Sequence, residues 1–234
     1  MDLRERVVLV TGAGRGIGRA TALAFSREGA RLALLGKTKK NILETQKLLK
    51  AAGAASCVFP GDVTEEGTVA RAVGAIEQQL GPIDVLVNNA GIYASAPIDA
   101  MDVVVFDRVI AVNLRGPFLF TRAVLPGMKG RRRGHIVNVA STAGRRGYLG
   151  GGAYCASKFG LVGLSEATMH EARKFDVRVS CVFPSTVATD MTMKGIANVS
   201  RAIQAEDVAE SIVSLVKMEG RAMVTALEIW QTNP

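Results

Sequence analysis

The chain is poor in aromatic residues and has no long apolar run. Aromatic side chains make up 5% of its 234 residues, with a single tryptophan, so we expect a core built from aliphatic and small side chains. No apolar stretch approaches the roughly 20 residues that a membrane-spanning helix needs. A charged segment followed by an apolar one is also missing at the start. The sequence therefore predicts neither membrane association nor a secretory leader.

Cysteine is scarce as well, and its spacing argues against two kinds of site. Cys57, Cys155 and Cys181 are an odd number and lack the spacing of metal ligands. Free thiols are typical of a reducing compartment. We therefore expect no disulfide framework, no metal site, and a location in the cytoplasm, with an organelle matrix as the alternative.

Acidic side chains are outnumbered by basic ones. Lysine and arginine number 29 against 21 aspartate and glutamate residues, which gives a formal net charge of +8. This balance favours anionic partners, namely a phosphorylated cofactor, an acidic carrier protein or nucleic acid. The basic clusters Lys37–Lys40 and Arg131–Arg133 are short and have no aromatic residues interleaved for base stacking. We therefore expect no nucleic-acid binding.

A nucleotide-binding unit is indicated near the N-terminus. Val7–Val10 is a continuous apolar run typical of a strand covered on both faces. A helical apolar pattern follows and ends near Gly29, before a second predicted strand at Arg31–Leu35. In this context glycines let the backbone approach a pyrophosphate at the helix N-terminus, although a plain strand–helix turn is the alternative. The loop between the first strand and the helix contains Gly12, Gly14, Arg15, Gly16, Ile17 and Gly18.

The residues after the second predicted strand bear on the choice between NAD and NADP. An NAD-selecting site normally carries an acidic residue there, which binds the ribose 2′-hydroxyl. This chain has Gly36 followed by Lys37, and Arg15 lies inside the glycine loop. Two cations without a carboxylate suit a 2′-phosphate. The sequence therefore predicts NADP(H) as the cofactor.

Strands and helices alternate along the rest of the chain without a repeat or a linker, which indicates an α/β fold with a doubly wound parallel sheet in one domain, residues 1–234. The two helices between residues 102 and 128 are expected to break near Arg115–Pro117. The further predicted strands are Ser56–Pro60, Val85–Val87, His135–Val139, Arg178–Phe183 and Ala222–Trp230. The further predicted helices are Asn41–Ala51, Glu66–Leu80, Asp102–Leu114, Gly116–Met128, one beginning near Tyr154, and Ala205–Met218.

Polar and small residues follow the predicted strands, at the edge where open α/β sheets bind ligands. Asp62 and Val63 follow the third strand, and Asp62 either binds the adenine amino group or caps the helix that begins near Thr64. Asn88–Gly91, including Asn89 and Ala90, follows the fourth strand, and Ser141 ends the fifth. Asn113 is polar within an apolar stretch, so it is either a hydrogen-bonded structural residue at a kink or a functional one.

Tyr154 and Lys158 lie four residues apart at the start of a stretch with helical apolar spacing. This spacing puts them one turn apart on nearly the same helix face. An ammonium close to a phenol favours the phenolate, so we expect the pKa of Tyr154 to lie below its reference value near 10. Tyr154 is thereby a candidate general acid and base. Such a pair alone is common on amphipathic helices, and its weight comes from the other motifs.

Together these motifs resemble the classical short-chain dehydrogenase/reductase family, from about Val7 to Asp190, in the style of its 3-oxoacyl-(acyl-carrier-protein) reductases. The resemblance implies a Rossmann fold with strand order 3-2-1-4-5-6-7 and an NADP(H) site. The matching positions are Thr11-Gly12-x-x-x-Gly16-x-Gly18, Asp62, Asn88-Asn89-Ala90-Gly91, Asn113, Ser141, Tyr154-x-x-x-Lys158 and Thr189. The implied cofactor-binding residues beyond the glycine loop are Lys37, Asp62, Val63, Asn89, Ala90, Gly91, Tyr154, Lys158, Pro184, Val187 and Thr189.

The resemblance also implies roles for individual residues. Tyr154 would protonate a substrate carbonyl oxygen, or deprotonate the alcohol in reverse, while Ser141 would hold that oxygen. Lys158 would bind the nicotinamide ribose and lower the pKa of Tyr154. Asn113 would anchor a water that links Lys158 to solvent, and Thr189 would fix the nicotinamide amide.

Two positions depart from the family pattern. Ser185 follows Pro184 where the family often has glycine, and its side chain either crowds the nicotinamide or accompanies a different turn. Glu228–Trp230 stands where many members have a glycine-containing ending that contributes to subunit interfaces, which leaves open whether the expected homo-oligomer is a dimer or a tetramer. Met191 and Met193 either form a lid over substrate or pack in the core.

The expected function is that of an NADPH-dependent carbonyl reductase. Its substrate would be a small carbonyl compound or a 3-oxoacyl thioester on an acidic carrier, with Arg131–Arg133 and Arg173 as candidate docking residues. A non-catalytic NADPH sensor or scaffold is the alternative. The intact set of Tyr154 and Lys158 argues against it, because such a protein would tolerate the loss of either residue.

Overall fold

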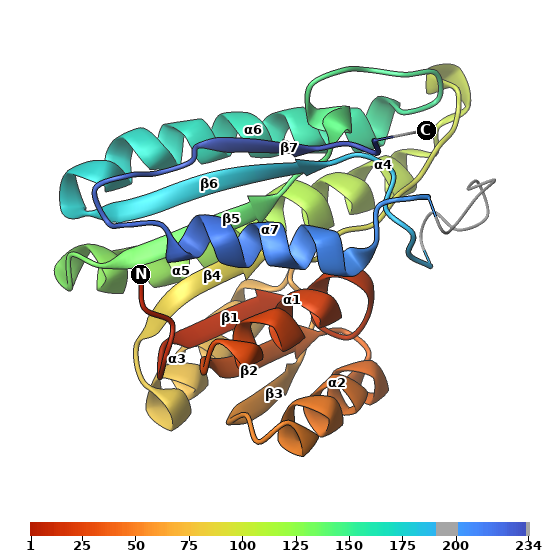
Figure 1. The fold of residues 1–234 in the computed structure, drawn as a ribbon. Coiled ribbons are helices and arrows are strands. Elements are labelled where there is room, and N and C mark those ends of the chain that lie inside the picture. The colour runs from red at the N-terminus through yellow and green to blue at the C-terminus, as the bar shows by residue number, and fades with distance from the viewer. Residues whose placement is uncertain (191–200, 233–234) are drawn as a thin grey trace.

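A computed structural model describes residues 1–190 and 201–232, and all structural statements below concern these residues. Seven parallel strands form one sheet in the order β3-β2-β1-β4-β5-β6-β7, with helices on both faces (Figure 1). Parallel neighbours require crossover connections, and the helices supply them. The predicted fold class and strand order are confirmed. No helix in the described part of the chain is long and apolar enough to cross a membrane.

The elements agree with the predicted ranges to within a few residues in most places. The last strand is shorter than predicted, because only four of its residues pair with β6. The strands are β1 (Val7–Thr11), β2 (Arg31–Gly36), β3 (Ser56–Pro60), β4 (Ile83–Asn88), β5 (Gly134–Val139), β6 (Val177–Pro184) and β7 (Ala226–Ile229). The helices are α1 (Gly16–Arg27), α2 (Lys39–Ala51), α3 (Glu66–Leu80), α4 (Val103–Ile110), α5 (Gly116–Gly130), α6 (Gly152–Ala172) and α7 (Ala205–Lys217).

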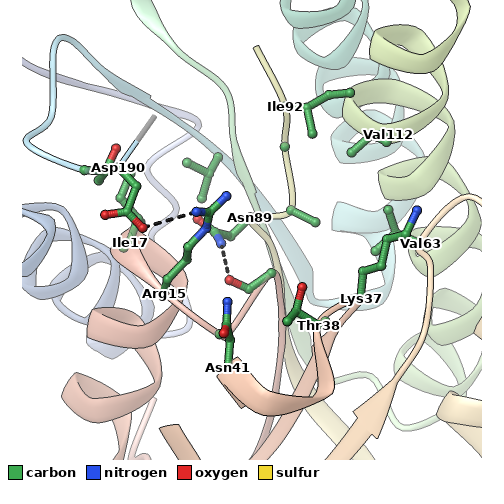
Figure 2. Close-up of a pocket in the computed structure, with 18 of the residues that line it drawn as sticks. Arg15, Ile17, Lys37, Thr38, Asn41, Val63, Asn89, Ile92, Val112 and Asp190 are labelled. Carbon is green, nitrogen blue, oxygen red and sulfur yellow. Dashed lines mark hydrogen bonds and ion pairs between the residues drawn. The ribbon is translucent and has the colours of Figure 1, made fainter. Parts of the chain in front are cut away.

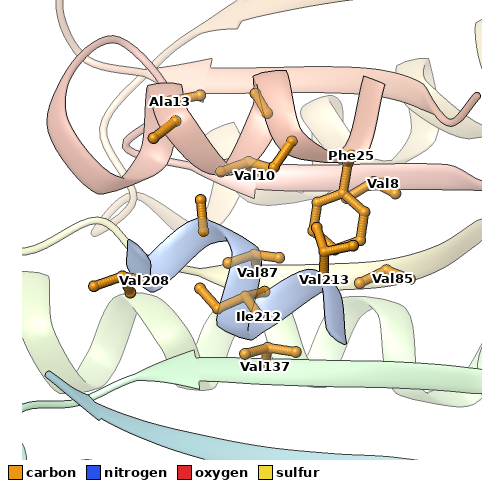
Figure 3. Close-up of a cluster of buried hydrophobic side chains, with 14 of the residues drawn as sticks. Val8, Val10, Ala13, Phe25, Val85, Val87, Val137, Val208, Ile212 and Val213 are labelled. Carbon is orange, nitrogen blue, oxygen red and sulfur yellow. The ribbon is translucent and has the colours of Figure 1, made fainter. Parts of the chain in front are cut away.

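Apolar cores lie on both faces of the sheet. Successive residues of a strand point to opposite faces. Accordingly, Val8 and Val10 of β1 pack with residues of α1 and α7, whereas Val7 and Leu9 pack with residues of α3 and α5. Figure 3 shows the first core, in which Phe25 of α1 meets Val213 of α7 above the sheet. Burial on both faces is the physical reason for the continuous apolar run of β1.

The expected break between α4 and α5 is absent, and that prediction is wrong. Residues Ala111–Arg115 form a π-helical turn, and Arg115 and Gly116 keep helical backbone angles as the chain enters α5. Pro117 is the second residue of α5, which directly follows the π turn, so the missing N–H of a proline falls where the α-helical pattern changes. The chain therefore stays helical through this region, and the wider π turn buries Asn113 completely.

His135 on β5 is the buried titratable group from which we expect the clearest pH effect on stability. Its Nε2 lies 2.8 Å from Ser180 Oγ, and its Nδ1 has no partner within the described residues. Burial, helped by the positive charge of Arg178, holds its pKa well below the ordinary value of ~6.5. The folded protein thus keeps His135 neutral where the unfolded chain binds a proton. The free energy of unfolding should therefore fall by up to about 1.4 kcal/mol per pH unit below pH ~6.5.

Urea unfolding between pH 7 and 5 measures this effect. The slope of the unfolding free energy against pH gives the number of protons taken up on unfolding. In His135→Asn this number should be smaller by about one. The matched control is His170→Asn, because His170 is the other of the two histidines and is exposed. An unchanged slope in His135→Asn would contradict the prediction.

Candidate active site

A cleft of about 320 Å³ opens at the carboxyl ends of the central strands. This is the edge at which open α/β sheets bind ligands. Figure 2 shows the side of the cleft where Arg15, Asn41, Thr38 and Lys37 lie. Most of the predicted site residues line it, namely Gly12, Gly14, Arg15, Gly16, Ile17, Lys37, Asp62, Val63, Asn89, Ala90, Gly91, Ser141, Tyr154, Lys158, Pro184, Val187 and Thr189.

The glycine loop runs close against the segment that follows β4. Gly12 has φ +65°, and a Cβ there would lie 2.8 Å from Ala90 Cα, so both conformation and space require glycine. Thr11 fixes this approach, because its Oγ1 accepts hydrogen bonds from the backbone N–H of Asn89 (3.0 Å) and of Ala90 (3.1 Å). Asn89 Nδ2 in turn donates to Thr11 O at 3.0 Å. The loop and the floor of the cleft therefore form one hydrogen-bonded unit.

Gly18 is a predicted cofactor-binding residue that does not line the cleft. A Cβ on Gly18 would lie 2.3 Å from Gly12 O and 2.5 Å from Asn89 Nδ2. The close packing of α1 against the glycine loop requires glycine at this place in the sequence motif. The structure thus separates Gly18 from the glycines that border the cleft.

Asn113 also lies outside the cleft lining, although it is close to it. Its Oδ1 accepts from Ile92 N at 2.8 Å, and its Nδ2 donates to Ile92 O at 2.9 Å and to Ser157 Oγ at 3.0 Å. The structural alternative for Asn113 is met in part, because the residue is hydrogen-bonded but lies in a π turn and not at a kink. Its functional role stays a prediction. Around Gly91, a Cβ would lie 3.4 Å from Asn113 Oδ1 and 3.8 Å from Lys158 Nζ. The amide and the ammonium therefore flank the same small space.

Tyr154 and Lys158 occupy the first turns of α6 and face the cleft together, as the spacing predicts. Lys158 Nζ lies 5.6 Å from the centroid of the Tyr154 ring and donates to Val139 O at 2.9 Å. Ser141, which follows β5, makes a side-chain hydrogen bond with Tyr154 and accepts from Ala143 N at 3.1 Å. The ring of Tyr93 meets that of Tyr154 edge-on, with centroids 5.2 Å apart. These contacts fix the phenol at the edge of the cleft.

The expected lowering of the Tyr154 pKa is not found in the chain by itself, and that prediction is wrong. Burial raises the pKa of Tyr154 to about 12, against the opposing effect of its hydrogen bond with Ser141. Burial likewise lowers the pKa of Lys158 to about 8. Desolvation is the largest cause of both shifts, because the charged forms of buried groups lose hydration. The phenol accordingly holds its proton at neutral pH.

At the other end of the cleft, Asp62 is bound by two cations and a threonine. Its Oδ2 accepts from Arg108 at 2.6 Å and from Lys37 at 3.1 Å, while its Oδ1 accepts from Thr64 N and Oγ1 at 3.0 and 2.9 Å. Burial opposes its ionisation, but these hydrogen bonds outweigh burial and lower its pKa. Helix α3 begins at Glu66 with Glu65 at its N-cap, so the alternative that Asp62 caps this helix is wrong.

Several residues of the cleft were not among the predicted ones. Arg108 and Val112 come from the helical segment 103–115, and Asp190 pairs with Arg15 at 3.2 Å (Figure 2). The sequence carries no local signal for these, since each reaches the cleft from a distant element. The further lining residues beyond the prediction are Gly36, Thr38, Asn41, Ile42, Gly61, Ile92, Val139, Ala140 and Ser185.

Ser185, which stands where the family often has glycine, continues the hydrogen bonding of the sheet. Its backbone N–H donates to Ile229 O at 2.9 Å, which extends the pairing of β6 with β7 past Pro184. Ser185 is thus tied to β7 at the border of the cleft. Met191 and Met193 lie outside the described residues.

The strand order and the cleft at the carboxyl edge of the sheet define a Rossmann-type fold. The family model described as short chain dehydrogenase matches residues 6–200, and the chain belongs to this family. It is 40% identical over 196 residues to the 3-oxoacyl-(acyl-carrier-protein) reductase FabG of Thermotoga maritima, covering 83% of this chain and 79% of the relative. It is 38% identical over 187 residues to 2-(S)-hydroxypropyl-CoM dehydrogenase 3 of Xanthobacter autotrophicus, covering 80% and 73%.

Solved structures agree with the fold. A crystal structure of levodione reductase superposes with a TM-score of 0.91 at 30% identity, covering 97% of this chain and 96% of that one. A metagenomic short-chain oxidoreductase in complex with NADP superposes with a TM-score of 0.88 at 33% identity, covering 99% and 100%. Nearly the whole chain therefore fits the architecture of the family.

Proposed function

We propose that the protein transfers a hydride between NADP(H) and a carbonyl compound or secondary alcohol. The observation that carries this proposal is the meeting of Tyr154, Lys158 and Ser141 at one edge of a cleft whose other edge is the glycine loop. The cofactor supplies the hydride chemistry, and the protein supplies position, a proton and charge.

Tyr154 is the proposed proton donor. A pKa of about 12 keeps its phenol protonated at neutral pH, so it can give a proton to a carbonyl oxygen during reduction. Its hydrogen bond with Ser141 places a second donor beside that oxygen. Lys158, in its charged form below pH of about 8, stabilises the phenolate left behind.

Asn113 is proposed to support the return of the proton. Its amide and the Lys158 ammonium both border the space around Gly91. A water held there would connect Lys158 with solvent, in keeping with the family resemblance. Gly91 leaves this space open because it has no side chain.

The proposed preference for NADP(H) rests on charge. Lys37 and Arg15 are largely exposed cations at the cleft, and each is paired with a single carboxylate, Asp62 and Asp190 respectively. Cations of this kind can turn to a 2′-phosphate at small cost, because exposed ion pairs contribute little. The NADP complex of the related metagenomic oxidoreductase supports the same assignment.

A free small carbonyl compound is the proposed substrate, with a 3-oxoacyl thioester as the specific candidate suggested by the relative from Thermotoga maritima. The predicted carrier-docking arginines do not support that candidate. Arg131 and Arg133 bind Ile83 O and Asp84 at the amino ends of β4 and β5, the opposite edge of the sheet from Tyr154. Arg132 pairs with Asp176 there, next to Arg173.

We further propose that the protein forms a homodimer or homotetramer and is located in the cytoplasm.

Oxidation of NADPH in the presence of a panel of ketones, with a carrier-bound 3-oxoacyl thioester included, tests the proposal. We expect turnover with at least one carbonyl compound and a higher kcat/KM for NADPH than for NADH. Equal use of both cofactors would contradict the assignment of NADP(H). Binding of NADPH without turnover of any compound would favour the alternative of a sensor or scaffold.

A further inference from the structure

The end of the cleft opposite Tyr154 holds one carboxylate between two cations. We infer that Arg108 is a specificity residue for NADP(H) that acts through Asp62. When the cofactor binds, Arg108 remains the cation paired with the Asp62 carboxylate. Lys37 can then leave Asp62 and bind the 2′-phosphate. This inference rests on the proposed function and adds a residue that neither the glycine loop nor the end of β2 contains.

Asp62 is a fixed and charged group. Its side chain is only 12% exposed, and both of its oxygens accept two hydrogen bonds. Thr64 holds Oδ1, while Arg108 and Lys37 share Oδ2. Arg108 also donates to Thr64 Oγ1 at 3.3 Å, so it is anchored to the same turn at two points. The carboxylate therefore stays in place when one of its cations leaves.

The two cations differ in how firmly they are held. The Arg108 side chain is 40% exposed and lies 2.6 Å from Oδ2, whereas the Lys37 side chain is 72% exposed and lies 3.1 Å away. A short charge-assisted hydrogen bond from a guanidinium is stronger than a screened ion pair of an exposed lysine. Lys37 is thus the cation that departs first. Figure 2 shows it reaching into the cleft beside Val63 and near Thr38.

The charges then decide between the two cofactors. A 2′-phosphate at the end of β2 needs a free cation and is repelled by an unbalanced carboxylate. With Arg108 present, the negative charge of Asp62 is still neutralised after Lys37 has turned to the phosphate. Without Arg108, Asp62 keeps Lys37 and its own charge opposes the phosphate. NAD(H) has a neutral 2′-hydroxyl, so its binding requires neither step.

Isothermal titration calorimetry of NADP⁺ and NAD⁺ with Arg108→Met tests this inference without measuring turnover. We expect NADP⁺ to bind about tenfold more weakly than to the wild type, which corresponds to ~1.4 kcal/mol. The dissociation constant of NAD⁺ should change by less than about twofold, within ~0.4 kcal/mol. Arg122→Met is the matched control, because Arg122 makes an exposed ion pair with Glu66 and does not line the cleft. Both dissociation constants should be unchanged in it.

A second variant separates this mechanism from general damage to the site. In Asp62→Asn/Arg108→Met the carboxylate that competes for Lys37 is gone, so NADP⁺ affinity should return to within about threefold of the wild type. Equal weakening of both cofactors in Arg108→Met, unchanged NADP⁺ binding, or no recovery in the double variant would overturn the inference while the proposed function stands. A wild-type protein that binds neither cofactor would overturn the proposed function and this inference together.

Discussion

Replacing Tyr154 with phenylalanine should lower kcat by about 10³-fold, within the 10²–10⁴ range typical of general acid catalysis. The change removes the hydroxyl that gives its proton to the carbonyl oxygen and keeps the ring that packs against Tyr93. Cofactor binding should be nearly unaffected, because the glycine loop and the Asp62 end of the cleft are untouched. Steady-state kinetics together with NADPH titration measures both quantities.

The matched control for this variant is Tyr93→Phe. It removes a neighbouring phenol hydroxyl while the edge-on ring contact with Tyr154 stays possible. We expect its kcat to remain within about threefold of the wild type, since this hydroxyl takes no part in the proposed proton transfer. Turnover by Tyr154→Phe at a tenth of the wild-type rate or more would exclude Tyr154 as the proton donor.

Gly18→Ala should destabilise the protein by about 1–3 kcal/mol, the range seen when a side chain is forced into a packed site. Alanine is otherwise preferred over glycine in a helix by about 1 kcal/mol. The new Cβ, however, would stand 2.3 Å from Gly12 O and 2.5 Å from Asn89 Nδ2. Helix α1 must therefore move away from the glycine loop, which should also weaken NADPH binding. Urea unfolding and NADPH titration measure these two effects.

Gly74→Ala is the matched control for this substitution. Gly74 is also a helical glycine, in α3, but a Cβ there has nothing within 4 Å. The helix preference then acts alone, and we expect stabilisation by about 0.5–1 kcal/mol. If both variants were stabilised alike, the packing argument for Gly18 would fail.

The sequence was sufficient to predict the sheet and most of the cleft. In a parallel sheet the carboxyl end of every strand lies at one edge, so residues that directly follow strands must gather there. For this reason Gly12, Lys37, Asp62, Asn89 and Ser141 are placed correctly at the cleft by strand boundaries alone.

The errors concern properties that depend on distant residues. The π turn at Ala111–Arg115 leaves the apolar pattern helical, so the sequence gives no sign of it. The direction of the Tyr154 pKa shift depends on burial, which the four-residue spacing to Lys158 does not reveal. Arg108 reaches Asp62 across 46 positions of the chain, and no local motif predicts such a pair.

The π turn also governs how the second half of the helical segment is oriented. Each residue of a helix advances the direction of its side chain by about 100°. Ala111–Arg115 carries one more residue than an α-helical turn would, so the faces of α5 are set relative to α4 by that single extra position. Deleting one residue here would rotate Phe120 and Val124 away from the sheet they cover. These five residues thus set the rotation of α5 about its axis relative to α4. This rotation lets α4 line the cleft while α5 packs on the sheet.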